Sequence, residues 1–175
     1  MKNQNGFSLI ELLIVVVIIG IIAAIAIPNL LASRRASNEA SAISSLRTFH
    51  GAQMIYQATL GAGNYAGAAG SALNTQAFTD LGTANLIDSG LGSGLKSGYR
   101  FTALMVTMGT GTPASFCGRA LPATITGLTA TGTRKFGIAT DGVIQSASAS
   151  ISFGAGCSIG TAGEAYVSGA TPLNN

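Results

Sequence analysis

The sequence predicts an α+β protein in which one long N-terminal helix packs on a four-stranded antiparallel sheet. Three observations predict it. An unbroken apolar segment near the N-terminus has the length of a membrane-spanning helix. A second helical pattern follows it directly, and the C-terminal half contains β-favouring runs joined by turn residues. The 175 residues leave room for one domain of ordinary size beside the anchor.

The apolar segment covers residues 7–28 and is predicted to be a transmembrane helix. Its 21 residues before Pro28 would span about 31 Å, which matches a hydrocarbon core about 30 Å thick. The segment is too long for the apolar region of a secretory signal peptide, and no small-residue cleavage site follows it. A polar hexapeptide that ends in glycine, MKNQNG, precedes it at residues 1–6.

Glu11 is the unusual residue of the anchor, because it is the only charged residue between Lys2 and Arg34. A carboxylate inside hydrocarbon is costly and needs a partner. The stretch NGFSLIELLIVVVIIGIIAAIAIPNL resembles the N-terminus of a type IV pilin or of a type II secretion pseudopilin. The short leader ending in glycine, the Phe-Ser-Leu-Ile-Glu sequence and the proline after the apolar run match that family in kind and spacing.

The resemblance implies that residues 1–6 are a leader peptide, that a prepilin peptidase cuts between Gly6 and Phe7, and that the new Phe7 amine is N-methylated. Glu11 follows Phe7 by four residues, which places the two on one helix face. When staggered helices bundle, Glu11 of one subunit can meet the Phe7 amine of its neighbour, and the resemblance supports this assembly pair. The alternative is a glutamate that only complements the helix dipole at the membrane edge.

Residues 29–60 are predicted to continue the helix as an amphipathic segment. Mostly apolar residues recur at steps of three and four, at Ala42, Leu46, Phe49, Gln53, Tyr56 and Leu60. Pro28 has no N–H and predicts a kink where the two halves of the helix meet. The resemblance implies further that the stretch between Gly20 and Pro28 unwinds in an assembled filament.

The rest of the chain is predicted to be loop, sheet and loop. Residues 61–98 are rich in glycine and alanine and read as a surface loop with short helical turns, without a phosphate-binding pattern. Residues 99–149 carry the antiparallel sheet, and Asp141-Gly142 predicts a hairpin with a two-residue type I′ turn. Residues 150–175 are predicted to be a C-terminal loop.

Cys117 and Cys157 are the only cysteines, and in an exported domain they predict a disulfide. Closing a loop of about 40 residues would stabilise the fold by about 4 kcal/mol on the chain-entropy view, and would staple residues 150–175 to the sheet. The charges that flank the anchor do not decide its orientation. The cysteine pair places the C-terminal domain outside the cytoplasm.

Several functional classes lack the residues that they need. Charged residues make up only 9% of the chain and are scattered, so no nucleic-acid site is evident. Two cysteines and His50 do not have the spacing of a metal site. No catalytic constellation and no cofactor site can be named, and an aromatic content of 6% does not support electron conduction along the protein.

The resemblance implies a structural subunit, the major pilin of a type IV pilus that serves adhesion, motility or DNA uptake. The expected partners are further copies through the N-terminal helices, the prepilin peptidase and methylase, the inner membrane before assembly, and the pilus assembly platform. The protein would be an inner-membrane precursor and then an extracellular filament.

Two other functions stay open at this point. The first is a pseudopilin of a type II secretion system that drives protein export. Major pseudopilins usually carry a calcium site at the end of the sheet, whereas residues 150–175 hold one acid, Glu164. A membrane-tethered enzyme is the least favoured of the three.

Overall fold

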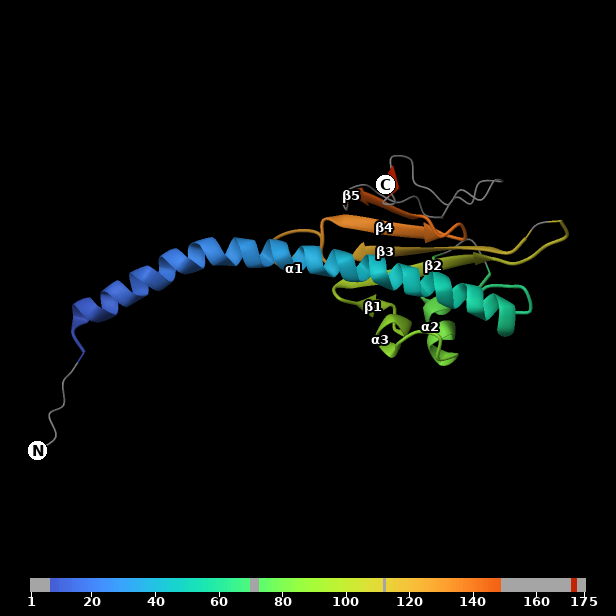
Figure 1. Cartoon of the computed structure of the whole chain (residues 1–175), viewed down its shortest axis with the longest axis horizontal. Coiled ribbons are helices and arrows are strands. Elements are labelled where there is room, and N and C mark those ends of the chain that lie inside the picture. Colours follow the sequence, from blue (N-terminus) through green and yellow to red (C-terminus); the bar gives the residue numbers. More distant parts are fainter. Residues whose placement is uncertain (1–6, 70–72, 112, 149–170, 173–175) are drawn as a thin grey trace, which may run out of the picture. The chain divides into compact units, whose positions relative to one another are not determined.

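The computed structural model describes residues 7–69, 73–111, 113–148 and 171–172. The described helices are α1 (Leu9–Thr59), α2 (Gln76–Thr83) and α3 (Ser89–Gly92). The described strands are β1 (Leu95–Lys96), β2 (Tyr99–Val106), β3 (Ser115–Pro122), β4 (Arg134–Ala139), β5 (Ile144–Ser148) and β6 (Thr171–Pro172). The chain divides into two compact units, Met1–Arg34 and Arg35–Asn175 (Figure 1).

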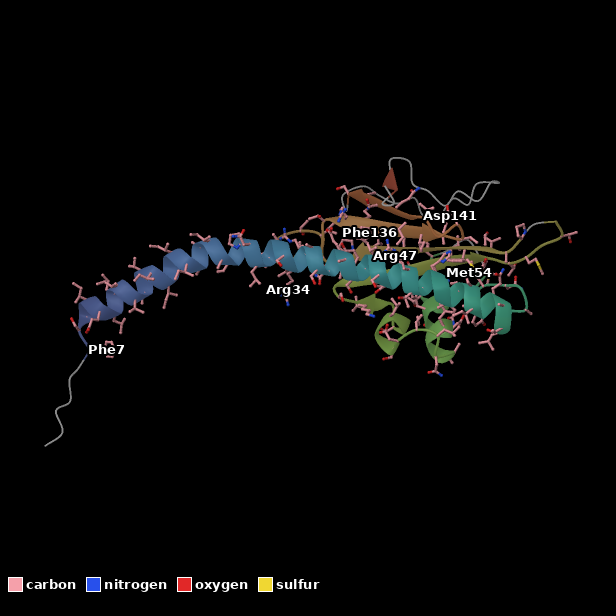
Figure 2. All side chains as sticks on the ribbon, in the orientation of Figure 1. Phe7, Arg34, Arg47, Met54, Phe136 and Asp141 are labelled. Atoms are coloured by element: carbon pink, nitrogen blue, oxygen red, sulfur yellow. The ribbon has the colours of Figure 1, made fainter. Side chains whose placement is uncertain are left out.

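The first unit contains the apolar N-terminal part of α1. From Leu9 to Leu30 its leucine, isoleucine and valine side chains are all more than half exposed, and Figure 2 shows them standing out around the helix after Phe7. Among the described residues, α1 is the one helix long and apolar enough to cross a membrane, judged by length and composition. Such a surface requires lipid or other helices to cover it.

The second unit begins with the C-terminal part of α1, which packs on one face of the sheet (Figure 1). Ala42, Leu46 and Phe49 are fully buried, as the periodicity of the sequence predicted. Gln53 continues the stripe and satisfies both of its polar atoms on the backbone of Ala66, at 3.0 and 2.8 Å. Leu60 was predicted to belong to this stripe, but it lies after the end of α1 and is 61% exposed.

The sheet is antiparallel and follows the order β1-β2-β3-β4-β5-β6, so that strands adjacent in the sequence are adjacent in space. The α+β class predicted from the sequence is confirmed, and β2, β3, β4 and β5 are its long strands. The predicted number of four strands is wrong, because β1 and β6 extend the sheet at its edges. Each of these has two residues, too few to show the alternation by which strands are recognised in a sequence.

The core is built around Phe49 of α1. Its ring stacks on Phe78 of α2 at 4.4 Å between centroids and meets the Phe116 ring of β3 edge-on at 5.6 Å. Gly118 of β3 lies directly beneath the same ring, since a Cβ built there would be 2.7 Å from Phe49 Cε1. A glycine is therefore required where α1 approaches β3.

The β4–β5 hairpin was predicted correctly, but its turn type was not. The Gly142 N–H donates to the Ala139 carbonyl at 2.9 Å, so the central residues of the turn are Thr140 and Asp141. Type I′ needs a positive φ at both central residues, and neither has one. Gly142, with a φ of 76°, instead follows the turn, and Asp141 Oδ1 accepts from the Val143 N–H at 2.9 Å.

Residues 61–98 contain α2, α3 and β1. Leu81 and Leu91 are fully buried and bring α2 and α3 into the core with Phe78. Asp88 caps α3 by accepting from the Leu91 N–H at 3.1 Å, and it also pairs with Lys96 at 2.8 Å.

Candidate functional site

The first turn of α1 holds the lone acid of the anchor in a defined position. The Ser8 N–H donates to Glu11 Oε2 at 3.0 Å. Because α1 begins at Leu9, Ser8 is the N-cap residue and Glu11 is the third residue of the helix, so this bond is the glutamate half of a capping box. The carboxylate also lies at the positive end of the helix dipole. The cap therefore fixes the Glu11 side chain at the start of the helix.

Phe7 lies before α1 in the uncleaved chain, and this corrects one step of the sequence reasoning. Phe7 and Glu11 were placed on one helix face, but only residues inside the helix share its periodicity. The physical reason is that serine is a far better N-cap than phenylalanine. The pattern Ser8-Leu9-Ile10-Glu11 is itself a capping-box signature, and it was the signal in the sequence that would have located the start of the helix.

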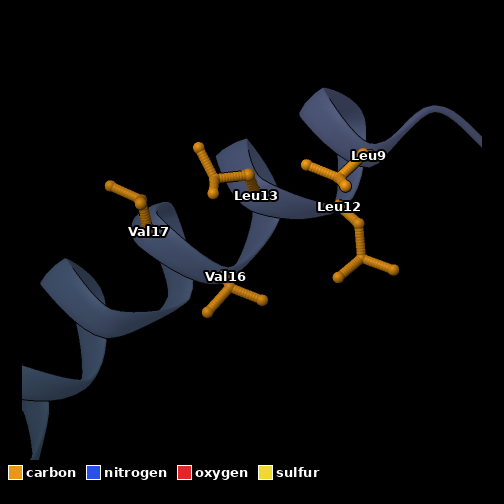
Figure 3. A pocket seen from close by; sticks show the side chains of 5 residues that line it. All are labelled: Leu9, Leu12, Leu13, Val16 and Val17. Atoms are coloured by element: carbon orange, nitrogen blue, oxygen red, sulfur yellow. The ribbon is translucent and has the colours of Figure 1, made fainter.

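An apolar groove runs along the same end of α1. Its five lining side chains recur at the helical steps i, i+3, i+4, i+7 and i+8, and Figure 3 shows them in two rows with a shallow space between them. They are Leu9, Leu12, Leu13, Val16 and Val17. The groove lies on the outer surface of a single helix and is lined by apolar side chains alone, so it can receive apolar side chains of a neighbouring helix or lipid chains.

Gly20 and Pro28 both lie inside α1, which is helical throughout the stretch between them. Pro28 cannot donate a hydrogen bond to the Ala24 carbonyl one turn earlier. Nothing lies within 4 Å of a Cβ built on Gly20, so packing within this chain does not require a glycine there. The unwinding between Gly20 and Pro28 was implied for an assembled filament, and it stays a prediction.

A buried carboxylate in the second unit was not identified from the sequence. Glu39 is 6% exposed. Its Oε1 accepts from the Thr133 N–H and hydroxyl at 2.8 Å each and from the Arg134 N–H at 3.2 Å, and its Oε2 accepts from Arg134 Nε at 2.8 Å. Burial alone would raise the pKa of the Glu39 carboxyl, but the hydrogen bonds from Thr133 and Arg134 hold it below its ordinary value. The group ties α1 to the start of β4 and has a structural role.

The other predicted site residues are only partly described. Cys117 of β3 is buried and disulfide-bonded, and Cys157 and Gly6 lie outside the described residues. The Cys117–Cys157 pairing and the cleavage position therefore stay predictions. Within the described ranges, no group of three or more His, Cys, Asp or Glu residues could hold a metal ion.

The geometry of the N-terminus agrees with a comparison to known proteins. The prokaryotic N-terminal methylation motif matches residues 1–27. This chain carries that motif. Over 57 residues it is 49% identical to the type IV wide pilus major component PilA4 of Thermus thermophilus. The aligned stretch covers 33% of this chain and 44% of that protein.

Of two further relatives, one is named as a type IV pilin and the other as a type II secretion protein. The chain is 52% identical over 54 residues to the type IV major pilin protein PilA of Myxococcus xanthus, covering 31% of this chain and 24% of that protein. It is 33% identical over 57 residues to the type II secretion system core protein G of Klebsiella pneumoniae, covering 33% of this chain and 41% of that protein. The chain thus spans less than half the length of these curated relatives. No solved structure matches it.

These matches confirm the predicted resemblance to type IV pilins and type II secretion pseudopilins.

Proposed function

We propose that the protein is a structural subunit that polymerises into an extracellular type IV pilus, as its major pilin, for adhesion, motility or DNA uptake. The observation that carries this proposal is the N-terminal unit: a methylation motif followed by an exposed apolar helix that contains one carboxylate at its first turn. Two relatives, at 49% and 52% identity, are named for type IV pili, and another, at 53%, is named a fimbrial protein. The role is structural rather than catalytic.

The first step is the removal of residues 1–6. Cleavage between Gly6 and Phe7 replaces a peptide bond by a cationic amine, which is then N-methylated on Phe7. The new charge lies one residue from Ser8, whose N–H already binds Glu11. The partners for this step are the prepilin peptidase and methylase. The apolar part of α1 holds the precursor in the inner membrane.

The second step is the pairing of charges between subunits. An ionised carboxylate has two oxygens and accepts about four hydrogen bonds, so Glu11 can keep its bond from Ser8 and still accept from the Phe7 amine of a neighbour. The cap reduces the freedom of the Glu11 side chain before assembly, which lowers the entropy lost on pairing. The apolar groove lined by Leu9, Leu12 and Val16 would be covered by the same neighbouring helix.

The precursor would be anchored in the inner membrane with its C-terminal domain outside the cytoplasm, and the pilus assembly platform would transfer it into the filament. The length and apolar composition of the N-terminal part of α1 favour this membrane anchoring. Cys117 supports an oxidising location for the domain, because disulfides persist in such compartments.

The second candidate is a type II secretion pseudopilin, which the 33% identity to core protein G favours. The two functions are separated by deleting the gene and examining the cells by electron microscopy and the culture medium by protein electrophoresis. Loss of surface filaments with normal secretion supports the pilus. Retention of filaments together with exoproteins held back in the cell would overturn it in favour of the pseudopilin.

A further inference from the structure

The second unit has two distinct ends, defined by the sheet. The β3–β4 loop (residues 123–133) lies at the end where Tyr99 pairs with Pro122, which we name the loop end. The β2–β3 connection follows Val106, which pairs with Ser115 at the opposite end, which we name the hairpin end. The eight residues of β2 separate the two ends by about 26 Å.

The β3–β4 loop is held firmly against α1. Arg35 donates from Nε to the Ala130 carbonyl and from Nη2 to the Gly127 carbonyl, both at 3.2 Å, and Asn38 Nδ2 donates to the Thr131 carbonyl at 2.9 Å. Within the loop, the Thr131 N–H donates to the Thr124 carbonyl at 2.9 Å. Three backbone carbonyls of the loop thus accept hydrogen bonds from side chains of α1, which hold this part of the loop in place before any partner binds.

This fixed loop presents its large apolar side chains to solvent. Leu128 is 76% exposed, more than any other large apolar side chain described in the second unit, and Ile125 is 55% exposed. A single exposed apolar residue needs no explanation. Two exposed apolar side chains on one preorganised loop are typical of a docking surface, because the loop loses little conformational entropy on binding.

The hairpin end carries a second exposed apolar surface. Leu60 and Met108 are 61% and 58% exposed. Asn64 Oδ1 accepts from the Met108 N–H at 2.8 Å, and Met108 Cε lies 3.7 Å from the place of a Cβ on Gly63. Gly63 and Asn64, which follow α1, therefore contact the segment after β2, and we name the two exposed apolar side chains at this end the Leu60–Met108 surface.

We propose that the β3–β4 loop of one copy docks through Leu128 on the Leu60–Met108 surface of another copy that is displaced along the filament. This inference rests on the proposed polymerisation. Parallel copies displaced along their helices bring the loop end of one against the hairpin end of another. A contact between two different surfaces generates an open helical array where the rotation between copies does not close into a ring.

Charge also favours a second copy as the occupant. Arg35 lies at the loop end. The exposed Asp141, in the β4–β5 turn, lies at the hairpin end, because Ala139 pairs with Cys117 and Cys117 with Leu104 (Figure 2). Opposite charges at the two ends steer copies into the head-to-tail arrangement and disfavour contacts between like ends.

Cysteine cross-linking in filaments tests the contact. The full chain carrying both Leu128→Cys and Met108→Cys is expressed in pilated cells, and sheared filaments are oxidised and run on a gel without reductant. We expect a ladder of covalent multimers that collapses to monomer on reduction. The matched control combines Met108→Cys with Leu95→Cys, at a site 54% exposed on the edge strand β1, and should give no ladder.

The outcomes separate this inference from the proposed function. Filaments of the Leu128→Cys/Met108→Cys variant that give no ladder would overturn the docking contact and leave polymerisation intact. Dimers formed by Leu128→Cys alone would show a symmetric contact and would also overturn it, as would protection of that thiol by phospholipid vesicles instead of by assembly. Absence of filaments from the unsubstituted chain would refute the proposed function itself.

Discussion

Gly118→Ala should destabilise the second unit, because the added methyl group would overlap the Phe49 ring. A Cβ at residue 118 would lie 2.7 Å from Phe49 Cε1 and 3.0 Å from Cδ1, well inside the usual carbon–carbon contact of about 3.5–4.0 Å. The ring has little room to move, since Phe78 stacks on it at 4.4 Å and Phe116 meets its edge at 5.6 Å.

Overpacking of this kind costs about 1–3 kcal/mol, which lowers the melting temperature of a domain of this size by several degrees. Thermal unfolding of the detergent-solubilised full chain, followed by circular dichroism, measures the shift. Gly51→Ala is the matched control: it adds the same methyl to α1 where nothing lies within 4 Å, and it should stabilise the protein by up to about 1 kcal/mol.

A double-mutant cycle locates the cause. Replacing Phe49 by leucine removes the ring edge that the methyl meets, so Gly118→Ala should cost clearly less in the Phe49→Leu background than in the parent. The reasoning is refuted if Gly118→Ala melts at or above the temperature of the unsubstituted protein.

Three further predictions concern processing, the disulfide and pH. Gly6→Val should leave the leader attached, because a side chain hinders the approach of the peptidase to the backbone; intact-mass measurement checks it, and a mature chain that begins at Phe7 would contradict it. Mass spectrometry without reductant should find Cys117 joined to Cys157, whereas two free thiols in exported protein would refute the predicted disulfide. Because the folded pKa of Glu39 is lowered from 4.5, its stabilisation is fully present above about pH 4.5 and is lost as the pH falls through the folded value. Glu39→Gln should therefore flatten the loss of melting temperature in acid, and an unchanged acid profile would show that another group is responsible.

The sequence predicted those features that arise from periodicity. The stripe of Ala42, Leu46 and Phe49 and the long strands β2 to β5 repeat at helical and strand spacing, and repeated burial on one face leaves such a pattern. Two-residue strands have no period to detect. The turn at Thr140-Asp141 was missed because Asp-Gly fits both a two-residue turn and a three-residue loop that ends in glycine.

Pairings over long sequence separations could not be predicted. Glu39 lies 94 residues before Thr133 and 95 before Arg134, and nothing local in the sequence marks them as partners. Arg35 likewise binds carbonyls of the β3–β4 loop through its position on α1. The hydrogen bond from the Ser8 N–H to the Glu11 carboxylate could be predicted, because the pattern that indicates it lies within four consecutive residues.

Filament yield from Glu11→Gln tests directly whether the Glu11 carboxylate pairs with the Phe7 amine of a neighbouring subunit. Glutamine also serves in a capping box, so this variant keeps the hydrogen bond from Ser8 and loses only the charge that would meet the Phe7 amine of a neighbour. We expect normal insertion and normal cleavage after Gly6, with polymerisation lost or strongly reduced, because an unpaired buried charge costs on the order of several kcal/mol at every subunit. Yield is measured by shearing filaments from cells and quantifying the subunit. A normal yield from Glu11→Gln would show that Glu11 acts only as a helix cap, and would contradict the pairing of charges between subunits.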